Sequence, residues 1–158
     1  MWYFCFMSST EERVGLHIDY LMVDHKGMSG EDIVILRERA NWGTEHDADL
    51  WQRVIDDSIA SVGIIGPRGN LVGAGFLAGN ERHAVLCDLV VNPNHRGLGI
   101  GKSIIRRRIE IAEQKNIPYL YTELAPTNNL SSFYEQLGFV ATGKAFTRAT
   151  RQHPSELE

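Results

Sequence analysis

Three glycines at alternate positions link an apolar, β-branched run to an isoleucine-rich segment, and this stretch constrains the fold more than any other. It reads LVVNPNHRGLGIGKS and spans residues 89–103. The apolar run predicts the end of a strand, Asn92 and Pro93 predict a turn, and the segment after the last glycine predicts a helix. The glycines uncover backbone N–H groups at the positive end of the helix dipole, where a phosphate or pyrophosphate is stabilised. An ordinary tight turn is the alternative, and three spaced glycines after an arginine argue against it.

Two well-known phosphate-binding motifs do not fit this loop. The Walker pattern G-x-x-x-x-G-K-S/T ends correctly at Gly101, Lys102 and Ser103, but Arg96 stands where its first glycine is required. The dinucleotide fingerprint G-x-G-x-x-G would need a glycine at Lys102 or at Ile104. Both nucleotide-binding classes are therefore excluded.

A third motif, R/Q-x-x-G-x-G/A, is met by Arg96, Gly99 and Gly101. The strand before it ends in L-x-V-x-P, and residues 134–139 follow the pattern Y-x-x-x-G-F. Through these three motifs the chain resembles the GNAT N-acetyltransferase superfamily over residues 16–146. In that family the loop holds the pyrophosphate of acetyl-CoA.

The resemblance implies a set of residues at the acetyl-CoA site and no metal. The family usually has an asparagine separated by six residues from its tyrosine. In this chain five residues separate Asn128 from Tyr134, and Thr127 stands at the expected position of the asparagine. Either Asn128 or Thr127 is therefore a candidate to contact the pantetheine arm of acetyl-CoA. The predicted cofactor-binding residues are the strand end Leu89, Val90 and Val91, the loop Arg96, Gly97, Leu98, Gly99, Ile100, Gly101 and Lys102, and Asn128.

Amide formation from a thioester needs a base for the amine, a donor for the oxyanion and an acid for the departing thiolate. A primary amine with a pKa of ~10 is only ~0.1% neutral at pH 7, a penalty of ~4 kcal/mol. The resemblance implies that backbone N–H groups of residues 89–91 supply the donor and that Tyr134 is the acid. The alternative for Tyr134 is a tyrosine packed under the loop.

Two carboxylates are candidates for the base. Some relatives place an acid or a histidine at positions corresponding to Val85 and Cys87, and this chain has neither. Asp88 is the nearest carboxylate, with a structural role in capping loop N–H groups as its alternative, and Glu123 is the second candidate. The resemblance further suggests Trp42, Glu45 and Trp51 as pocket-lining residues, unless both tryptophans belong to the core.

Hydrophobic periodicity predicts a single α/β (α+β) domain. The resemblance implies that its sheet is mixed, centrally splayed and flanked by helices. Alternation places Leu86, Asp88 and Val90 on one face of a strand and Cys87, Leu89 and Val91 on the other. Strands are predicted at 16–23, 61–65, 71–78, 84–91, 119–124 and from Phe139, and helices at 29–40, 47–60, 99–115 and about 129–137.

The composition fits one domain over residues 1–158 with peripheral tails at 1–15 and 148–158. A net charge of −4 predicts no nucleic-acid partner, and the basic run at 106–108 is interpreted as the solvated face of a helix. Cys5 and Cys87 are spaced neither for zinc nor as a disulfide framework, which indicates a cytoplasmic protein. The apolar residues 1–7 are too short to span a membrane.

These observations predict an acetyl-CoA-dependent N-acetyltransferase that acts on a small primary amine by direct transfer in a ternary complex, compatible with a homodimer. The strand and helix pair look most like aryl-alkylamine and amino-sugar acetyltransferases. Polyamines, aminoglycosides and a protein's α-amino or lysine group stay open as acceptors. A non-catalytic acyl-CoA sensor or assembly module is the rival class, because it would share the same loop.

Overall fold

The computed structural model describes residues 12–13, 19–43, 45–122 and 131–140. The chain divides into two compact units, Met1–Glu123 and Leu124–Glu158. The first unit contains the sheet and three of the described α-helices, and the second contains one short helix. Among the described residues, no helix is both long and apolar enough to cross a bilayer.

The first unit is built on a mixed sheet in which the strands lie in sequence order. All neighbours are antiparallel except β5 and β6, which are parallel and paired from His83–Tyr119 to Leu86–Thr122. The mixed sheet with flanking helices is as predicted, while any continuation of β6 beyond Thr122 lies outside the described residues. The strands are β1 (Glu12–Arg13), β2 (Leu21–Val23), β3 (Ala60–Ile65), β4 (Leu71–Gly79), β5 (His83–Val91) and β6 (Tyr119–Thr122).

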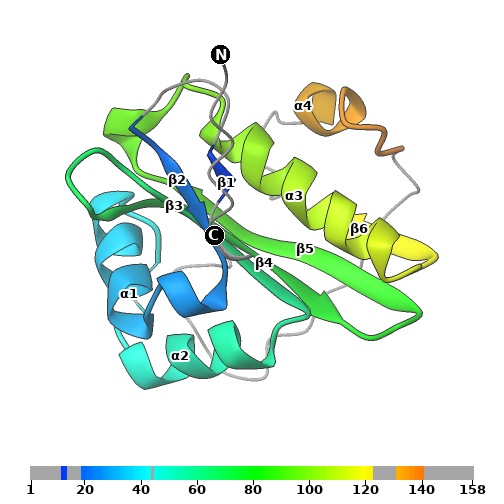
Figure 1. The fold of residues 1–158 in the computed structure, drawn as a ribbon, viewed down its shortest axis with the longest axis horizontal. Helices are drawn as coiled ribbons and strands as arrows, with labels where there is room; N and C mark the ends of the chain where they lie inside the picture. The colour runs from blue at the N-terminus through cyan, green and yellow to red at the C-terminus, as the bar shows by residue number, and fades with distance from the viewer. Residues whose placement is uncertain (1–11, 14–18, 44, 123–130, 141–158) are drawn as a thin grey trace, which may run out of the picture. The chain divides into compact units, whose positions relative to one another are not determined.

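Helices cover both faces of this sheet (Figure 1). Helices α1 (Gly30–Arg39) and α2 (Ala48–Asp57) bury apolar side chains on one face, and α3 (Ile100–Gln114) does so on the other. The first core contains Ile33, Leu36, Trp51, Ile55, Phe76 and Val90, and the second contains Val62, Ile64, Val72, Ile100 and Ile104.

Local signals account for the starts and ends of the helices. Ser29 and Asp32 form a capping box at the start of α1, with the Asp32 backbone N–H donating to Ser29 Oγ over 3.3 Å and the Ser29 N–H donating to Asp32 Oδ2 over 2.9 Å. The prediction that the second helix runs to residue 60 is wrong. Ser58 ends it by donating its N–H and its hydroxyl to the Val54 carbonyl, and Ala60 already belongs to β3.

The prediction that the basic run at 106–108 is a solvated face is also wrong. Arg106 is exposed, and Arg107 pairs with Glu110 at 3.2 Å, but Arg108 is completely buried. Arg108 lies four residues from both Ile104 and Ala112, so helical periodicity places it on the apolar face of α3. That spacing is the signal that could have identified it.

The second unit contains α4 (Ser131–Glu135), inside the predicted helix at about 129–137. Gly138 follows with φ +87°, a left-handed conformation that suits the predicted helix stop. Phe139 and Val140 are not in a strand, contrary to the predicted start of one at Phe139, and the rest of that segment lies outside the described residues.

Candidate active site

The glycine loop between β5 and α3 requires two of its glycines for conformational reasons. Gly97 and Gly99 have φ of +77° and +79°, values that L side chains rarely adopt. Gly101 has no such value, and a Cβ there would make ordinary contacts of 3.7 Å with Val91 and 3.9 Å with Leu89. The first two glycines therefore shape the loop, whereas Gly101 leaves the start of the helix bare.

Helix α3 begins at Ile100 without a side-chain cap. The first N–H groups of a helix have no partner within the helix, and they carry the positive end of its dipole. Arg96 stands at the other end of the loop, where its Nε donates to the carbonyl of Val91 over 3.3 Å. The predicted anion-binding geometry of strand, bare loop and helix N-terminus is present.

A β-bulge interrupts β5 immediately before the loop. Phe76 of β4 pairs with Cys87, but Ala74 pairs with Val90, so Asp88 and Leu89 together stand opposite the single Gly75. Asp88 takes up the extra residue in a left-handed conformation with φ +49°. Among the described strands, Leu89 has no register partner on β4 or β6. Its backbone N–H is therefore a candidate oxyanion donor.

The bulge overturns the predicted alternation of side chains along this strand. Cys87 and Val90 pack against the core under α1 and α2, whereas Leu89 and Val91 pack on the α3 side. The prediction that Cys87, Leu89 and Val91 share a face is wrong, because the inserted residue reverses the pleat between Cys87 and Leu89.

The carboxylate of Asp88 meets a buried arginine from α1. Arg37 Nη1 lies 3.4 Å from Asp88 Oδ1, and the two side chains are 10% and 37% exposed. The guanidinium stands 4.7 Å from the ring of Trp42 and 4.5 Å from that of Trp51. The structure thus gives Asp88 an ion pair with Arg37, and its alternative role in capping loop N–H groups stays a prediction. Asp88 stays accessible to solvent while Arg37 is held between two aromatic rings.

The two tryptophans divide between core and surface. Trp51 is 6% exposed and stacks on Phe76 with ring centroids 5.9 Å apart, so it belongs to the core. Trp42 is 40% exposed and lies over the Arg37 guanidinium, and Glu45 is partly buried. That Trp42 and Glu45 line a pocket stays a prediction. Arg37 was not among the predicted site residues, because its contacts with Trp42 and Trp51 arise only in the folded structure.

Arg108 reaches the bulge from α3. Its Nη1 donates to the carbonyls of Phe76 over 2.7 Å and of Cys87 over 3.0 Å, on the two strands that flank the bulge. A Cβ at Gly75 would lie 2.8 Å from Arg108 Cζ, so only glycine leaves room for the guanidinium. Hydrogen bonds to backbone carbonyls offset part of the cost of burying this charge. Sequence reasoning missed this contact, and a glycine inside a strand was the signal for it.

For three other predicted site residues, the structure gives no position relative to the glycine loop and the bulge. Glu123 and Asn128, like Thr127, lie outside the described residues. Tyr134 belongs to α4 in the second unit, where it is buried and packs edge-on against Phe133 at 5.3 Å and Phe139 at 5.7 Å. Its role as the acid stays a prediction.

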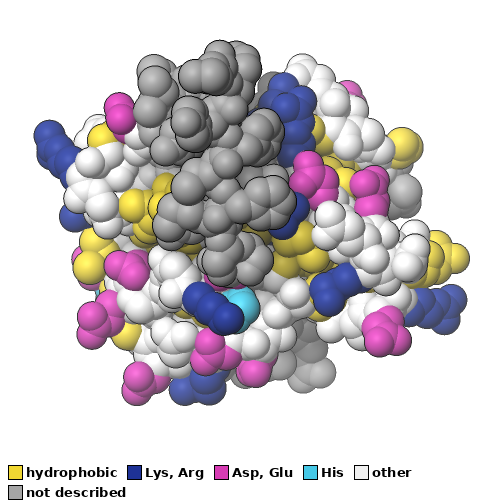
Figure 2. Space-filling model, in the orientation of Figure 1, with side chains coloured by type: hydrophobic (Ala, Val, Ile, Leu, Met, Phe, Trp, Pro, Cys, Tyr) yellow, Lys and Arg dark blue, Asp and Glu magenta, His cyan; other side chains and the backbone are white. Residues whose placement is uncertain are grey.

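The surface of the described part of the chain carries charges of both signs. On the face drawn in Figure 2, Lys and Arg side chains alternate with Asp and Glu side chains, and no broad area of one sign is visible among the coloured residues. The charges on this face therefore do not form the single-sign surface that an extended polyanion requires.

Comparisons with known proteins match this geometry. The sequence model of the acetyltransferase (GNAT) family matches residues 27–139. A glucosamine 6-phosphate N-acetyltransferase from Trypanosoma brucei brucei is 34% identical over 83 residues, which are 48% of this chain and 54% of that relative. The chain spans about a third to a half of the length of the curated relatives it matches.

Solved structures share the fold. A crystal structure of a Trypanosoma brucei acetyltransferase superimposes with a TM-score of 0.69 at 20% identity, over 83% of this chain and 99% of that one. The structure of AAC(6′)-Iy in complex with the bisubstrate analogue CoA-S-monomethyl-acetylneamine does so with a TM-score of 0.65 at 20% identity, over 84% and 99% of the two chains. At such identities these likenesses establish the architecture alone.

Proposed function

This chain belongs to the GNAT acetyltransferase family, and we propose that it transfers an acetyl group from acetyl-CoA to a primary amine of a small molecule within a ternary complex. The observation that carries the proposal is the bulge in β5, which leads directly into the bare loop at the start of α3. We also propose a cytoplasmic setting, since the two cysteines form no disulfide framework.

The loop and strand end supply a binding surface for the donor. N–H groups of Ile100, Gly101 and Lys102 open α3 and would donate to the pyrophosphate, with Gly97, Leu98 and Gly99 shaping the approach. Backbone groups of residues 89–91 would hold the pantetheine arm and the acetyl carbonyl. The AAC(6′)-Iy neighbour was solved with a bisubstrate analogue that contains CoA, which supports acetyl-CoA as the donor here.

The reaction requires the amine nitrogen to attack the thioester carbonyl carbon. A C–N bond forms, the carbonyl becomes an oxyanion, and the C–S bond then breaks to release CoA thiolate. The N–H of Leu89 is the candidate donor to the oxyanion, because Leu89 has no register partner on β4 or β6 among the described residues. The thiolate would take its proton from Tyr134.

Asp88 is the candidate base. Its carboxylate is 37% exposed and lies on the strand that carries the candidate oxyanion donor. The Arg37 guanidinium lies 3.4 Å from Asp88 Oδ1 and would orient this carboxylate, which would accept the amine proton directly or through a water molecule. Glu123 is the second candidate.

A thiol-release assay with acetyl-CoA and a panel of amines tests this function. The panel contains polyamines, aminoglycosides, amino sugars, aryl-alkylamines and a peptide with a free α-amino group. We expect turnover on a small-molecule amine and a loss of turnover in Asp88→Asn, with Asp49→Asn on the exposed surface of α2 as the matched control. Tight acetyl-CoA binding without turnover on any amine would instead indicate a non-catalytic acyl-CoA-binding module.

A further inference from the structure

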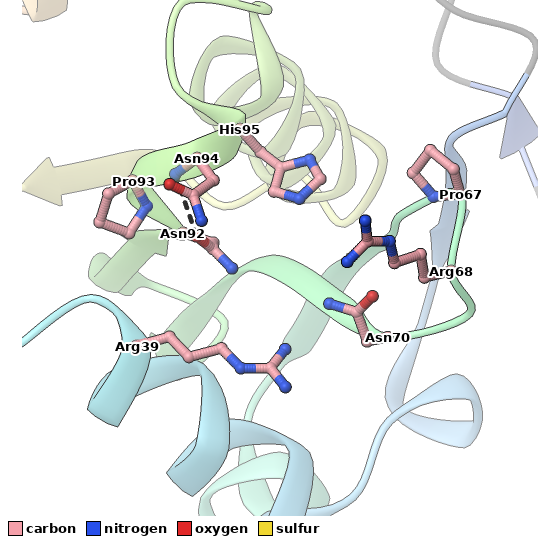
Figure 3. A pocket seen from close by; sticks show the side chains of 8 residues that line it. All are labelled: Arg39, Pro67, Arg68, Asn70, Asn92, Pro93, Asn94 and His95. Carbon is pink, nitrogen blue, oxygen red and sulfur yellow. Dashed lines mark hydrogen bonds between the residues drawn. The ribbon is translucent and has the colours of Figure 1, made fainter.

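A pocket of about 700 Å³ lies at the end of the sheet beside the glycine loop. It is formed by the C-terminal turn of α1, the turn between β3 and β4, and the residues that follow β5 (Figure 3). The polar residues that line it are Arg39, Asn70, Arg68, Asn92, Asn94 and His95.

None of the described residues that line this pocket is acidic, so none of them balances its positive charge. Figure 3 shows the guanidinium groups of Arg39 and Arg68 both directed into the pocket from opposite elements. Within residues 12–13, 19–43, 45–122 and 131–140, neither arginine has an ion pair or a hydrogen bond. In a chain of net charge −4, two guanidinium groups that have no ion-pair partner in the described part of the chain and are directed at one space indicate an anionic ligand.

A buried amide adds a neutral donor to these charges. Asn92 is 6% exposed, and its Oδ1 accepts the backbone N–H of Asn94 over 3.0 Å. The amide nitrogen is consequently the free end of this side chain, and it points toward the pocket in Figure 3. Asn92 is held in place by its own turn, so this donor is already oriented before a ligand arrives.

His95 is fixed in a similar way. Its Nδ1 lies 2.9 Å from the hydroxyl of Tyr20, and the two rings meet edge to face at 5.8 Å. The other ring nitrogen, Nε2, is left as the polar atom available to a ligand. The pocket therefore offers two guanidinium forks, an amide donor and an imidazole nitrogen.

We propose that this pocket binds the phosphomonoester group of a small molecule. A phosphomonoester presents three acceptor oxygens and close to two negative charges, which two guanidinium forks and an amide N–H can satisfy together. The volume exceeds that of a phosphate group and is typical of a small-molecule site, so it has room for the rest of the ligand beside Asn70 and Asn94.

Two molecules could bring such a group to this place. One is a phosphorylated amine acceptor, and the other is the acetyl donor, because CoA carries a 3′-phosphate and the pocket is formed in part by the residues just before Arg96. Identifying which of these two molecules carries the phosphate rests on the proposed function. The proposal that the pocket binds a phosphate group does not depend on that function.

Thermal unfolding with inorganic phosphate as the probe tests the site without any acetyl transfer. We expect phosphate to raise the melting temperature of the protein saturably, beyond sodium chloride at the same ionic strength. The variant Arg39→Gln/Arg68→Gln should weaken phosphate binding by about tenfold for each arginine replaced. Arg53→Gln/Arg106→Gln, which changes two exposed arginines outside the pocket, is the matched control and should behave like the wild type.

Calorimetry with CoA and 3′-dephospho-CoA then identifies the source of the phosphate. If the double variant binds CoA about tenfold or more weakly but 3′-dephospho-CoA normally, the ligand is the donor's 3′-phosphate. If both affinities are unchanged and KM rises for a phosphorylated amine but not for its unphosphorylated counterpart, the ligand is the acceptor. Either result supports the proposal.

The proposal is overturned if phosphate stabilises Arg39→Gln/Arg68→Gln as much as the control, or if it stabilises the wild type no more than chloride does. Both substituted side chains are exposed, so the variants should fold, and circular dichroism verifies that they do. Because the phosphate measurement involves no acetyl-CoA, its failure would leave the proposed acetyl transfer standing. Absence of turnover would in turn leave the phosphate result intact.

Discussion

The guanidinium of Arg108 occupies the space in which a side chain at Gly75 would stand, with Arg108 Cζ only 2.8 Å from an ideal Cβ at that position. Arg108 donates to the Phe76 and Cys87 carbonyls, next to the two residues of β5 that bulge opposite Gly75. We infer that glycine and arginine together support the bulge that shapes the candidate active site.

A double-mutant cycle tests this relationship. Arg108→Met leaves two carbonyls without this donor and should lower the free energy of unfolding by about 2–4 kcal/mol, and Gly75→Ala should lower it by about 1–3 kcal/mol through overpacking. The three atoms nearest to the added methyl group all belong to the Arg108 guanidinium. The double variant should therefore be destabilised by about 1 kcal/mol or more less than the sum of the two single variants. Urea denaturation measures all four proteins. Simple additivity would mean that the two positions do not interact.

Asp88→Asn should reduce kcat by about 10²-fold or more, because the carboxylate that accepts the amine proton is lost. Asparagine tolerates the left-handed conformation that Asp88 adopts at φ +49°, so the bulge should survive the change. Acetyl-CoA affinity measured by calorimetry should stay the same. A fully active Asp88→Asn protein would transfer the role of base to Glu123 or to water.

Arg37→Met should reduce kcat less than Asp88→Asn does, because the methionine keeps the packing between Trp42 and Trp51 but no longer orients the carboxylate. In the double variant Arg37→Met/Asp88→Asn, the loss of kcat should be smaller than the product of the two single losses. Arg53→Met on the exposed face of α2 is the control for the loss of charge. Equal activity of Arg37→Met and wild type would show that Arg37 has only a structural role.

Gly101→Val should fold normally and bind acetyl-CoA more weakly. A Cβ at this position makes only ordinary contacts with Val91 and Leu89, so the sheet and helix need not move. The added side chain would nevertheless cover the first N–H groups of α3, which the pyrophosphate is expected to approach. Calorimetry and the melting temperature separate the two effects, and unchanged affinity would remove this loop from the donor site.

Tyr134→Phe should lower kcat by about 10²-fold while KM for acetyl-CoA hardly changes, if the hydroxyl protonates the departing thiolate. Phenylalanine preserves the edge-on packing against Phe133 and Phe139. If the hydroxyl instead had a purely structural role, the loss of one buried hydrogen bond would cost about 1 kcal/mol of stability and leave turnover nearly unchanged. Measuring kcat and the melting temperature of this one variant decides between the two.

Much of the framework depends on interactions between residues close in the sequence, and these were predictable. The capping box of Ser29 and Asp32, the turn at residues 66–70 and the left-handed glycines of the loop all involve neighbours within a few positions. Local backbone preferences dominate at such places, because few other conformations satisfy the same N–H and C=O groups. The R/Q-x-x-G-x-G/A motif at Arg96, Gly99 and Gly101 was recognisable for the same reason, because its residues are also close in the sequence.

The tertiary structure decided which side chains meet at the site. Alternation alone assigns Cys87 and Leu89 to one face of β5. The bulge at Asp88 shifts the register and separates them, and it forms opposite Gly75, which lies on a different strand. Arg108 appeared in sequence as one of three basic residues, yet the packing of α3 on the sheet buries it against backbone carbonyls. The pair of Arg37 and Asp88 joins positions 51 residues apart. A short sequence window specifies local conformation, whereas burial and charge pairing depend on which distant elements the core brings together.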